Sequence, residues 1–457
     1  MRERTRSWGF KRAVVIAKTQ AEASYMKTAR CLFLCSGLML FLSLSSCSLE
    51  EPFLDFCGEF ERIPPVEEID QGVSVVFETP GTIVVQHGFG CARSQGGRFI
   101  KVEQSLGLPD YVNQATVILN GWRMNYDDDD HHLLVLAAAL GKIRFDQPRG
   151  AKKLSWEAVG VLADDNLHRA YGLCYYYTVV GWNQNKIQAV VDNGDADQFC
   201  KGGTGPKNFF ITTNSGTSTA LSGFLSFLQN NAFASRRAAI LPRGFGFGWQ
   251  GGDHHVLQVG CNLDADETFI TNQKYKKADT EAAPLATPNG RAGMGFVSWN
   301  TSAIFKDNDD RRSYMFAELV SGMAGNDVDV LQPPFPILPI AGPGFFGACL
   351  GESGPAGIKT EQVTIDNIPY AYAIPMLTGW EQWYGCDDHH VKEIGMWIDD
   401  IHYDVPPNSG AGTLRYRLSS VLVDSSNNTH GYRHKVSVLE LKPLPKPIVV
   451  EPPISER

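Results

Sequence analysis

The sequence predicts an all-β protein made of tandem antiparallel units of sandwich or jelly-roll type, three in number, with a divergent middle unit. Apolar or alternating runs of strand length are separated by Asp-rich or Gly/Pro-rich segments. Glycine makes up 45 of 457 residues and aromatic residues 11%, which is typical of strands joined by tight turns. Hydrophobic residues at 43% and charged residues at 20% allow real cores and exclude disorder over most of the chain.

An internal repeat is the strongest of these signals. Residues Cys91–Asp146 align without a gap with Cys349–Asp404, and 17 of the 56 positions are identical. Duplication on this scale indicates repeated structural units. The matches include Cys91 with Cys349, Gly121-Trp122 with Gly379-Trp380, Tyr126 with Tyr384, and Asp129-Asp130-His131-His132 with Asp387-Asp388-His389-His390.

A more divergent copy lies between these two. Gly248-Trp249 is followed by Asp253-His254-His255, with four residues fewer between the tryptophan and the histidines than in the other copies. The second half of the unit recurs as well, so each unit is expected to end in an aromatic strand, an Asp/Asn-rich turn and a strand opened by tyrosine. The recurring residues are Trp156, Asp164, Arg169 and Tyr171 in the first copy, Trp299, Asp307, Arg312 and Tyr314 in the second, and Tyr416, Asp424 and Tyr432 in the third.

Individual strands follow from the alternation of side chains along the chain. One segment, Leu221–Ala234, has helical spacing of its apolar residues and is the best helix candidate. The expected strands are Ala115–Leu119, His132–Phe145, Leu154–Leu162 and Tyr171–Trp182 in the first unit, and Thr413–Val423 and Tyr432–Leu441 in the last.

The domain organisation expected from these patterns has seven segments. Pro-rich stretches mark a linker before the last unit and a tail after it. The segments are a signal peptide at 1–46, a tether at 47–68, repeat units at 69–183, 184–331 and 345–442, the linker at 332–344 and the tail at 443–457.

The N-terminal segment carries an export signal. Lys27 and Arg30 precede the apolar run 32–46, which is shorter than the roughly 20 residues of a spanning helix. The run ends in Leu44-Ser45-Ser46-Cys47, which resembles the lipobox of bacterial lipoproteins. The resemblance implies that Cys47 carries lipid and becomes the mature N-terminus, and Ser48 implies sorting to the outer membrane. Met26 makes a more usual start, so we expect residues 1–25 to be an over-extended gene model. The alternative for the apolar run is an uncut membrane anchor or a buried helix.

Removal of the signal would leave an acidic, exported chain. Residues 47–457 hold 33 Lys+Arg and 48 Asp+Glu, a net charge of −15, without a basic cluster, so no nucleic acid partner is expected. Seven cysteines would remain besides Cys47, and an oxidising compartment permits disulfides between them. The absence of a CxxC pair argues against a zinc ribbon or a thioredoxin-like site. The pairing of these cysteines is left open.

The Asp-His-His triplets are the main candidates for chemistry, since they hold six of the eleven histidines. On a strand, residues two apart share a face, so each triplet offers a carboxylate and an imidazole to a divalent cation such as Zn²⁺ or Ca²⁺. The candidate pairs are Asp130 with His132, Asp253 with His255, and Asp388 with His390. The sequence does not identify the third and fourth ligands of such a site. Candidates in the first unit are Asp146, Asp164 and His168.

The competing interpretation is that the triplet is a feature of the scaffold. In it the aspartate caps a turn, one histidine packs beneath the tryptophan, and the other faces water. A motif present in every unit of an array is more often structural than catalytic, so the scaffold role is the favoured one.

The functional hypothesis is therefore a non-catalytic, lipid-anchored envelope protein whose units bind an envelope or surface partner or a glycan. The chain lacks GxSxG, HExxH and P-loop motifs. Trp122, Trp380 and Trp383 are candidates for stacking on sugar rings. The alternative is a metal-dependent hydrolase that uses the Asp-His-His triplets together with Asp146 and Asp404. The oligomeric state, and whether the protein faces the periplasm or the cell surface, are left open.

Overall fold

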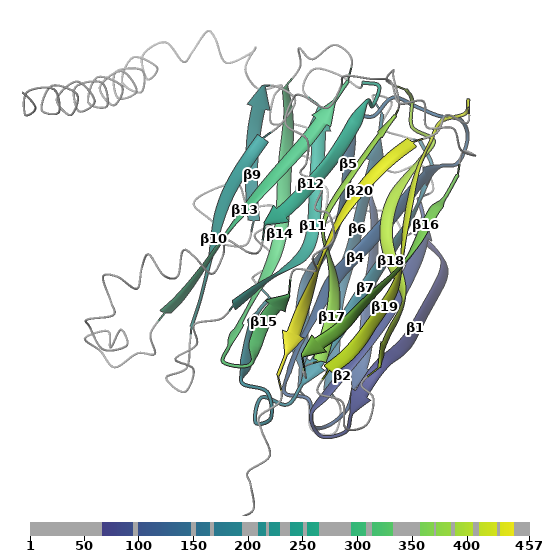
Figure 1. The fold of residues 1–457 in the computed structure, drawn as a ribbon. Coiled ribbons are helices and arrows are strands. Elements are labelled where there is room, and N and C mark those ends of the chain that lie inside the picture. Colours follow the sequence, from purple (N-terminus) through teal and green to yellow (C-terminus); the bar gives the residue numbers. More distant parts are fainter. Residues whose placement is uncertain are drawn as a thin grey trace, which may run out of the picture. The chain divides into compact units, whose positions relative to one another are not determined.

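A computed structural model describes much of the chain (Figure 1). The described residues are 66–94, 99–147, 152–164, 169–193, 209–215, 219–228, 238–249, 254–264, 294–307, 313–331, 357–369, 372–384, 389–404, 411–426 and 430–442. The predicted signal peptide, Cys47, the linker at 332–344 and the tail lie outside them.

All regular elements of the described residues are β-strands, so the predicted all-β class is confirmed. They form antiparallel sheets throughout. The strands are β1 (Glu67–Thr79), β2 (Ile83–Arg93), β3 (Ile100–Leu108), β4 (Gln114–Tyr126), β5 (Val135–Asp146), β6 (Lys152–Ala163), β7 (Tyr171–Trp182), β8 (Ala189–Asp192), β9 (Phe209–Ser215), β10 (Thr219–Leu228), β11 (Ala238–Trp249), β12 (Gln258–Asp264), β13 (Met294–Lys306), β14 (Ser313–Gly325), β15 (Val328–Leu331), β16 (Lys359–Pro369), β17 (Tyr372–Tyr384), β18 (Glu393–Asp404), β19 (Ala411–Val423) and β20 (His430–Leu441).

The three repeats share their sheets. One sheet has the order β1-β2-β7-β4-β18-β19-β16, a second β3-β6-β5-β11-β14-β8 with β9 also on β14, and a third β10-β13-β12-β17-β20-β15. Each sheet therefore joins strands of one repeat to strands of another. The tandem units predicted from the sequence are interlocked in space, because the inner strands of each repeat complete their hydrogen bonding on a neighbouring repeat.

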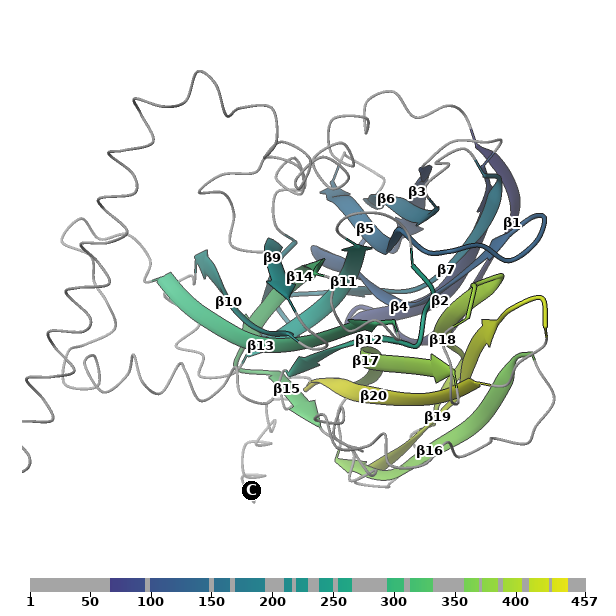
Figure 2. The same ribbon diagram turned by 90° about the horizontal axis from the view of Figure 1, so that it is seen from above.

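The junctions between repeats form a closed cycle. β4 of the first repeat pairs with β18 of the third, β11 of the second pairs with β5 of the first, and β17 of the third pairs with β12 of the second. Seen from above, these six strands lie side by side around a common centre (Figure 2). We call the line through this centre the pseudo-threefold axis.

A glycine sits at the same place in each junction. In β4, β11 and β17 the register shifts by one residue immediately before Gly121, Gly244 and Gly379. A Cβ on Gly121 would overlap the Cα and Cβ of Trp397 on the partner strand, and one on Gly244 would overlap Ala139. The bulge and the missing side chain together let two backbones meet near the axis.

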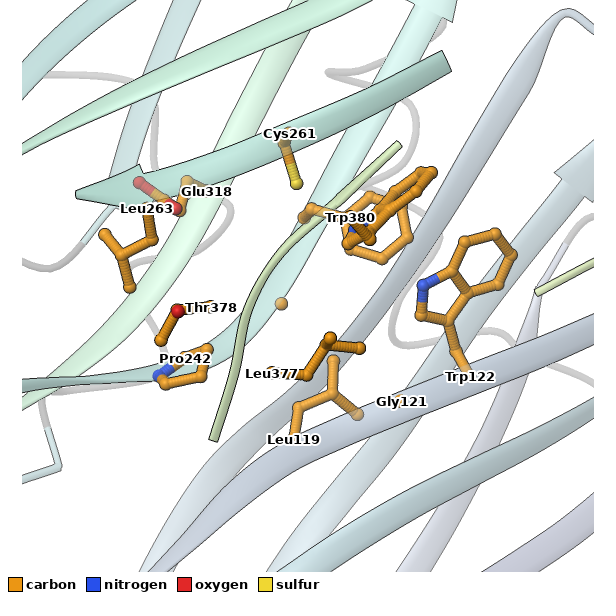
Figure 3. Close-up of a pocket in the computed structure, with 12 residues that line it drawn as sticks. Leu119, Gly121, Trp122, Pro242, Cys261, Leu263, Glu318, Leu377, Thr378 and Trp380 are labelled. Atoms are coloured by element: carbon orange, nitrogen blue, oxygen red, sulfur yellow. The ribbon is translucent and has the colours of Figure 1, made fainter. Parts of the chain in front are cut away.

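The core on the axis is aromatic. Trp122, Phe245 and Trp380, one from each repeat, have ring centroids 4.9–5.1 Å apart. A small cavity lies beside them, lined also by Leu119, Pro242 and Leu377 from equivalent positions of the three repeats (Figure 3). Cys261 borders this cavity, and its burial, with Glu318 nearby, raises the pKa of its thiol.

This arrangement corrects the sequence alignment of the middle repeat. The residue equivalent to Trp122 and Trp380 is Phe245, which occupies the same place after the strand bulge, whereas Trp249 is equivalent to Tyr126 and Tyr384. The first histidine of the pair then follows nine residues after the axial aromatic residue in every repeat. The sequence alignment showed an apparent loss of four residues because it matched Gly248-Trp249, instead of Gly244-Phe245, to the Gly-Trp pairs of the other two repeats.

Most of the strands predicted from the sequence are present, but the one predicted helix is not. The predicted strands of the first and last repeats are confirmed, although the strand expected from His132 begins at Val135. The helix expected at Leu221–Ala234 is wrong over Leu221–Leu228, which belongs to β10 and pairs with β13, while residues 229–234 lie outside the described residues. A short apolar run is compatible with either a helix or a buried strand. Here the segment forms a strand because it pairs with the edge of β13.

Among the described cysteines, Cys91 and Cys174 form a disulfide across the paired strands β2 and β7. Cys261 is free and buried. No helix in the described part of the chain is long and apolar enough to cross a membrane.

Replacement of Gly121 tests the close approach of the backbones. Gly121 has φ +148°, and any side chain would strike Trp397 of the neighbouring repeat. We expect Gly121→Ala to lower the free energy of unfolding by about 2–4 kcal/mol in urea titrations. Gly107→Ala is the matched control, because a Cβ at Gly107 meets nothing within 4 Å. Equal stability of the two variants would contradict the junction geometry.

Candidate metal centre

A ring of backbone hydrogen bonds encircles the axis where the three Asp-His-His segments begin. The His131 N–H donates to Val391 O at 3.0 Å, and the Val391 N–H donates to His131 O at 2.8 Å. The same exchange joins Leu133 to His254 and Val256 to His389. Each first histidine thus bonds to the residue two positions after the first histidine of another repeat. The six bonds tie the three repeats into one ring.

The first histidine of each pair is half-buried and packs against its own repeat. Its Nδ1 faces a carboxylate oxygen of the aspartate that recurs in the turn after the aromatic strand: His131 with Asp164 at 3.4 Å, His254 with Asp307 at 2.8 Å, and His389 with Asp424 at 3.2 Å. All three aspartates are nearly inaccessible. A buried carboxylate needs such partners, so the pair belongs to the scaffold.

An aromatic ring covers each of these imidazoles. The rings of Tyr126, Trp249 and Tyr384 lie 4.7–4.9 Å, centroid to centroid, from His131, His254 and His389 respectively. The first histidine is therefore held from two sides, by a carboxylate and by an aromatic ring in edge-on or tilted contact. The backbone at its position is fixed as a result.

The second histidines converge on the axis. The rings of His132, His255 and His390 have centroids 4.4–4.6 Å apart, and one nitrogen of each lies within 4.8 Å of the others. All three side chains are half-buried. We call these three residues the histidine tripod. The described residues offer this one group of three or more metal-ligating side chains.

The electrostatics at His390 favour its neutral imidazole. Burial lowers the pKa of His390, and the neighbouring His132 and His255 lower it further, while Asp130 acts in the opposite direction. A neutral imidazole is the form that coordinates a metal. The three rings are thus placed as ligands of one ion, and the lowered pKa of His390 favours the form that coordinates.

Asp130 lies beside the tripod and links two repeats. Its Oδ2 accepts the Ser425 amide at 3.0 Å, and its Oδ1 lies 3.6 Å from His390 Nδ1. Burial alone would raise the pKa of Asp130, but the hydrogen bond from the Ser425 amide, together with the neighbouring His390, holds that pKa below its ordinary value. Asp130 therefore acts as an outer partner of His390, whereas Asp253 and Asp388 lie outside the described residues.

The other residues singled out in the sequence have different places. Asp164 faces His131 and is no member of the tripod, Asp404 pairs with Arg415 at 3.5 Å, and Asp146 is exposed at the end of β5. His168 is outside the described residues. These positions assemble no second metal site within the described part of the chain.

The sugar-stacking hypothesis is wrong for two of its three tryptophans. Trp122 and Trp380 are 1% and 5% exposed, because their rings fill the axis with Phe245. Trp383 is half-buried against Gly431, with the guanidinium of Arg433 5.2 Å from its ring centre. A buried ring has no free face to offer a sugar.

The three histidines that the structure brings together are among those singled out in the sequence, but there each was paired with the carboxylate of its own triplet. Each triplet was expected to supply its own carboxylate and imidazole, because residues i and i+2 of a strand share a face. The structure takes one imidazole from each triplet and places the three together. The missing signal was the cyclic pairing of the repeats, which the recurrence of the motif along the chain does not reveal.

Comparison with known proteins adds no family. No family model matches the chain, and no curated protein matches it. Among solved structures, dimeric latent PorU from Porphyromonas gingivalis is similar at 8% identity and a TM-score of 0.11, over 76% of this chain and 33% of that chain. The chain thus spans about a third of that protein, and a likeness this weak carries no argument.

The two histidines of one pair are expected to behave differently on mutation. His254→Ala removes the contacts with Asp307 and Trp249, so it should cost about 2–4 kcal/mol of unfolding free energy, with or without chelator. His255→Ala should cost less in chelator, under about 1 kcal/mol, because its half-buried ring lies on the axis outside the buried core. Chemical denaturation of both variants measures the difference. Equal losses would contradict the separate roles.

Proposed function

We propose that this protein binds one transition-metal ion on its pseudo-threefold axis, with His132, His255 and His390 as ligands. The observation that carries the proposal is the convergence of three imidazole nitrogens from three separate repeats within 4.8 Å. Zinc–nitrogen bonds of about 2.0–2.1 Å place such nitrogens about 3.4 Å apart in a tetrahedral site. Small rotations of the three rings bring them to that separation.

The ligand set indicates the class of metal. Ca²⁺ prefers six to eight oxygen ligands, and the tripod supplies nitrogen alone. Imidazole suits zinc, copper, nickel and cobalt. Of the two ions considered from the sequence, Zn²⁺ therefore fits the tripod and Ca²⁺ does not.

The ion would act first as a cross-link. Its three ligands are separated by more than a hundred residues along the chain, and each adjoins a residue of the hydrogen-bonded ring. A ligand that binds the folded state stabilises it by mass action. The metal would thus hold the three repeats together at the place where they meet.

The cellular setting of the proposal rests on the sequence. The resemblance of residues 44–47 to a lipobox supports export and anchoring in a bacterial outer membrane through lipid on Cys47. The acidic mature chain and the interlocked repeats are consistent with a non-catalytic envelope protein that binds an envelope partner or a glycan. Nothing in its charge favours nucleic acid.

A second candidate is the metal-dependent hydrolase. Catalytic zinc sites use three protein ligands and keep one position for water, which is the number of histidines in the tripod. Among the described residues, Asp130 is the carboxylate beside the tripod, and it is engaged with Ser425 and His390. A structural ion is therefore the preferred function.

Metal content tests the proposal directly. We expect mass spectrometry to find one equivalent of Zn²⁺ per chain, and titration to show about 100-fold or greater loss of affinity in His132→Ala, His255→Ala and His390→Ala. His402→Ala is the control, since His402 is exposed and pairs with Asp400. Undiminished metal content in His255→Ala would reject the site.

The anchoring proposal has its own test. We expect Cys47→Ala to abolish lipid labelling and membrane retention, because that residue alone would carry the thioether-linked lipid. Membrane fractionation with a labelled fatty acid measures both, and Cys57→Ala serves as the control. A Cys47→Ala protein that stays with the membrane would refute the lipoprotein interpretation.

A further inference from the structure

The tripod presents its nitrogens on the outer side of the hydrogen-bonded ring. In each repeat the residue before the second histidine packs inward against an aromatic ring, and the residue after it is fully buried: Leu133, Val256 and Val391 are each 0% exposed. Neighbouring side chains of an extended segment point to opposite faces. His132, His255 and His390 therefore point away from the core.

An ion on the tripod would be bound from one side. The buried residues of the ring lie beneath it, and the His390 side chain remains 40% exposed. Zinc takes four ligands and its neighbours in the periodic table four to six, so three imidazoles leave at least one position unfilled. Among the described residues the nearest carboxylate is Asp130, whose Oδ2 is already bonded to the Ser425 amide.

We propose that the metal ion on the tripod keeps a coordination position on its outer face that exchanges with solvent, and that small oxygen or nitrogen donors bind there. This inference rests on the proposed function. Water or hydroxide fills the position when no other donor is present. Neutral imidazoles leave the charge of the ion uncompensated, so the bound water is more acidic than free water and anions are attracted.

Cobalt substitution gives the position a visible signal. The full chain loaded with one equivalent of Co²⁺ is titrated with azide and separately with imidazole, and its d–d absorption is followed. We expect a saturable change with one donor bound per cobalt. His402→Ala should respond like the wild type, whereas His255→Ala should lose the signal together with the metal.

The outcomes separate this inference from the proposed function. One bound Co²⁺ whose spectrum ignores both donors overturns the open position and leaves the metal site intact. If Asp130→Asn then responds to azide, Asp130 closes the site in the wild type, which also overturns the inference. Failure to bind Co²⁺ or Zn²⁺ at all rejects the proposed function and the inference with it.

Discussion

The whole arrangement depends on six backbone hydrogen bonds that join His131, His254 and His389 to Val391, Leu133 and Val256. Each bond crosses from one repeat to another, so the ring closes only when all three are present. The inner strands next to it have buried N–H and C=O groups that must find partners. They find them in the cycle β4–β18, β11–β5 and β17–β12. A single repeat would leave these groups exposed as open edges.

The ring also explains why two adjacent histidines recur. In an extended backbone, neighbouring side chains point to opposite faces. Here the first histidine points toward the core and the second points toward the axis, where the tripod lies. The first imidazole is fixed by Asp164, Asp307 or Asp424 on one side and by an aromatic ring on the other. That packing sets the backbone from which the second imidazole projects. In the proposed metal site, the scaffold role and the ligand role thus fall to different histidines of one pair.

Close packing on the axis restricts which residues the three repeats carry there. At Gly121 and Gly244 a Cβ would overlap backbone atoms of the partner strand, and at Gly379 it would press on the side-chain amide oxygen of Asn262. Next to these glycines, the indole rings of Trp122 and Trp380 and the phenyl ring of Phe245 pack together on the axis. The middle repeat has thus changed an aromatic residue but kept its glycine, because volume can be redistributed around an axis more easily than backbone can be moved.

The sequence by itself determined the all-β class, most strand positions, the repetition and the identity of the chemically interesting histidines. These follow from local alternation and from self-comparison, which need no knowledge of distant contacts. Only the tertiary structure decided that Phe245 and not Trp249 is the axial residue, that Thr219–Leu228 is a strand, and that one imidazole from each repeat meets the other two. Those outcomes depend on which repeat pairs with which. Pairing between strands more than a hundred residues apart is set by the closing of three shared sheets, a constraint that no single segment of the chain contains.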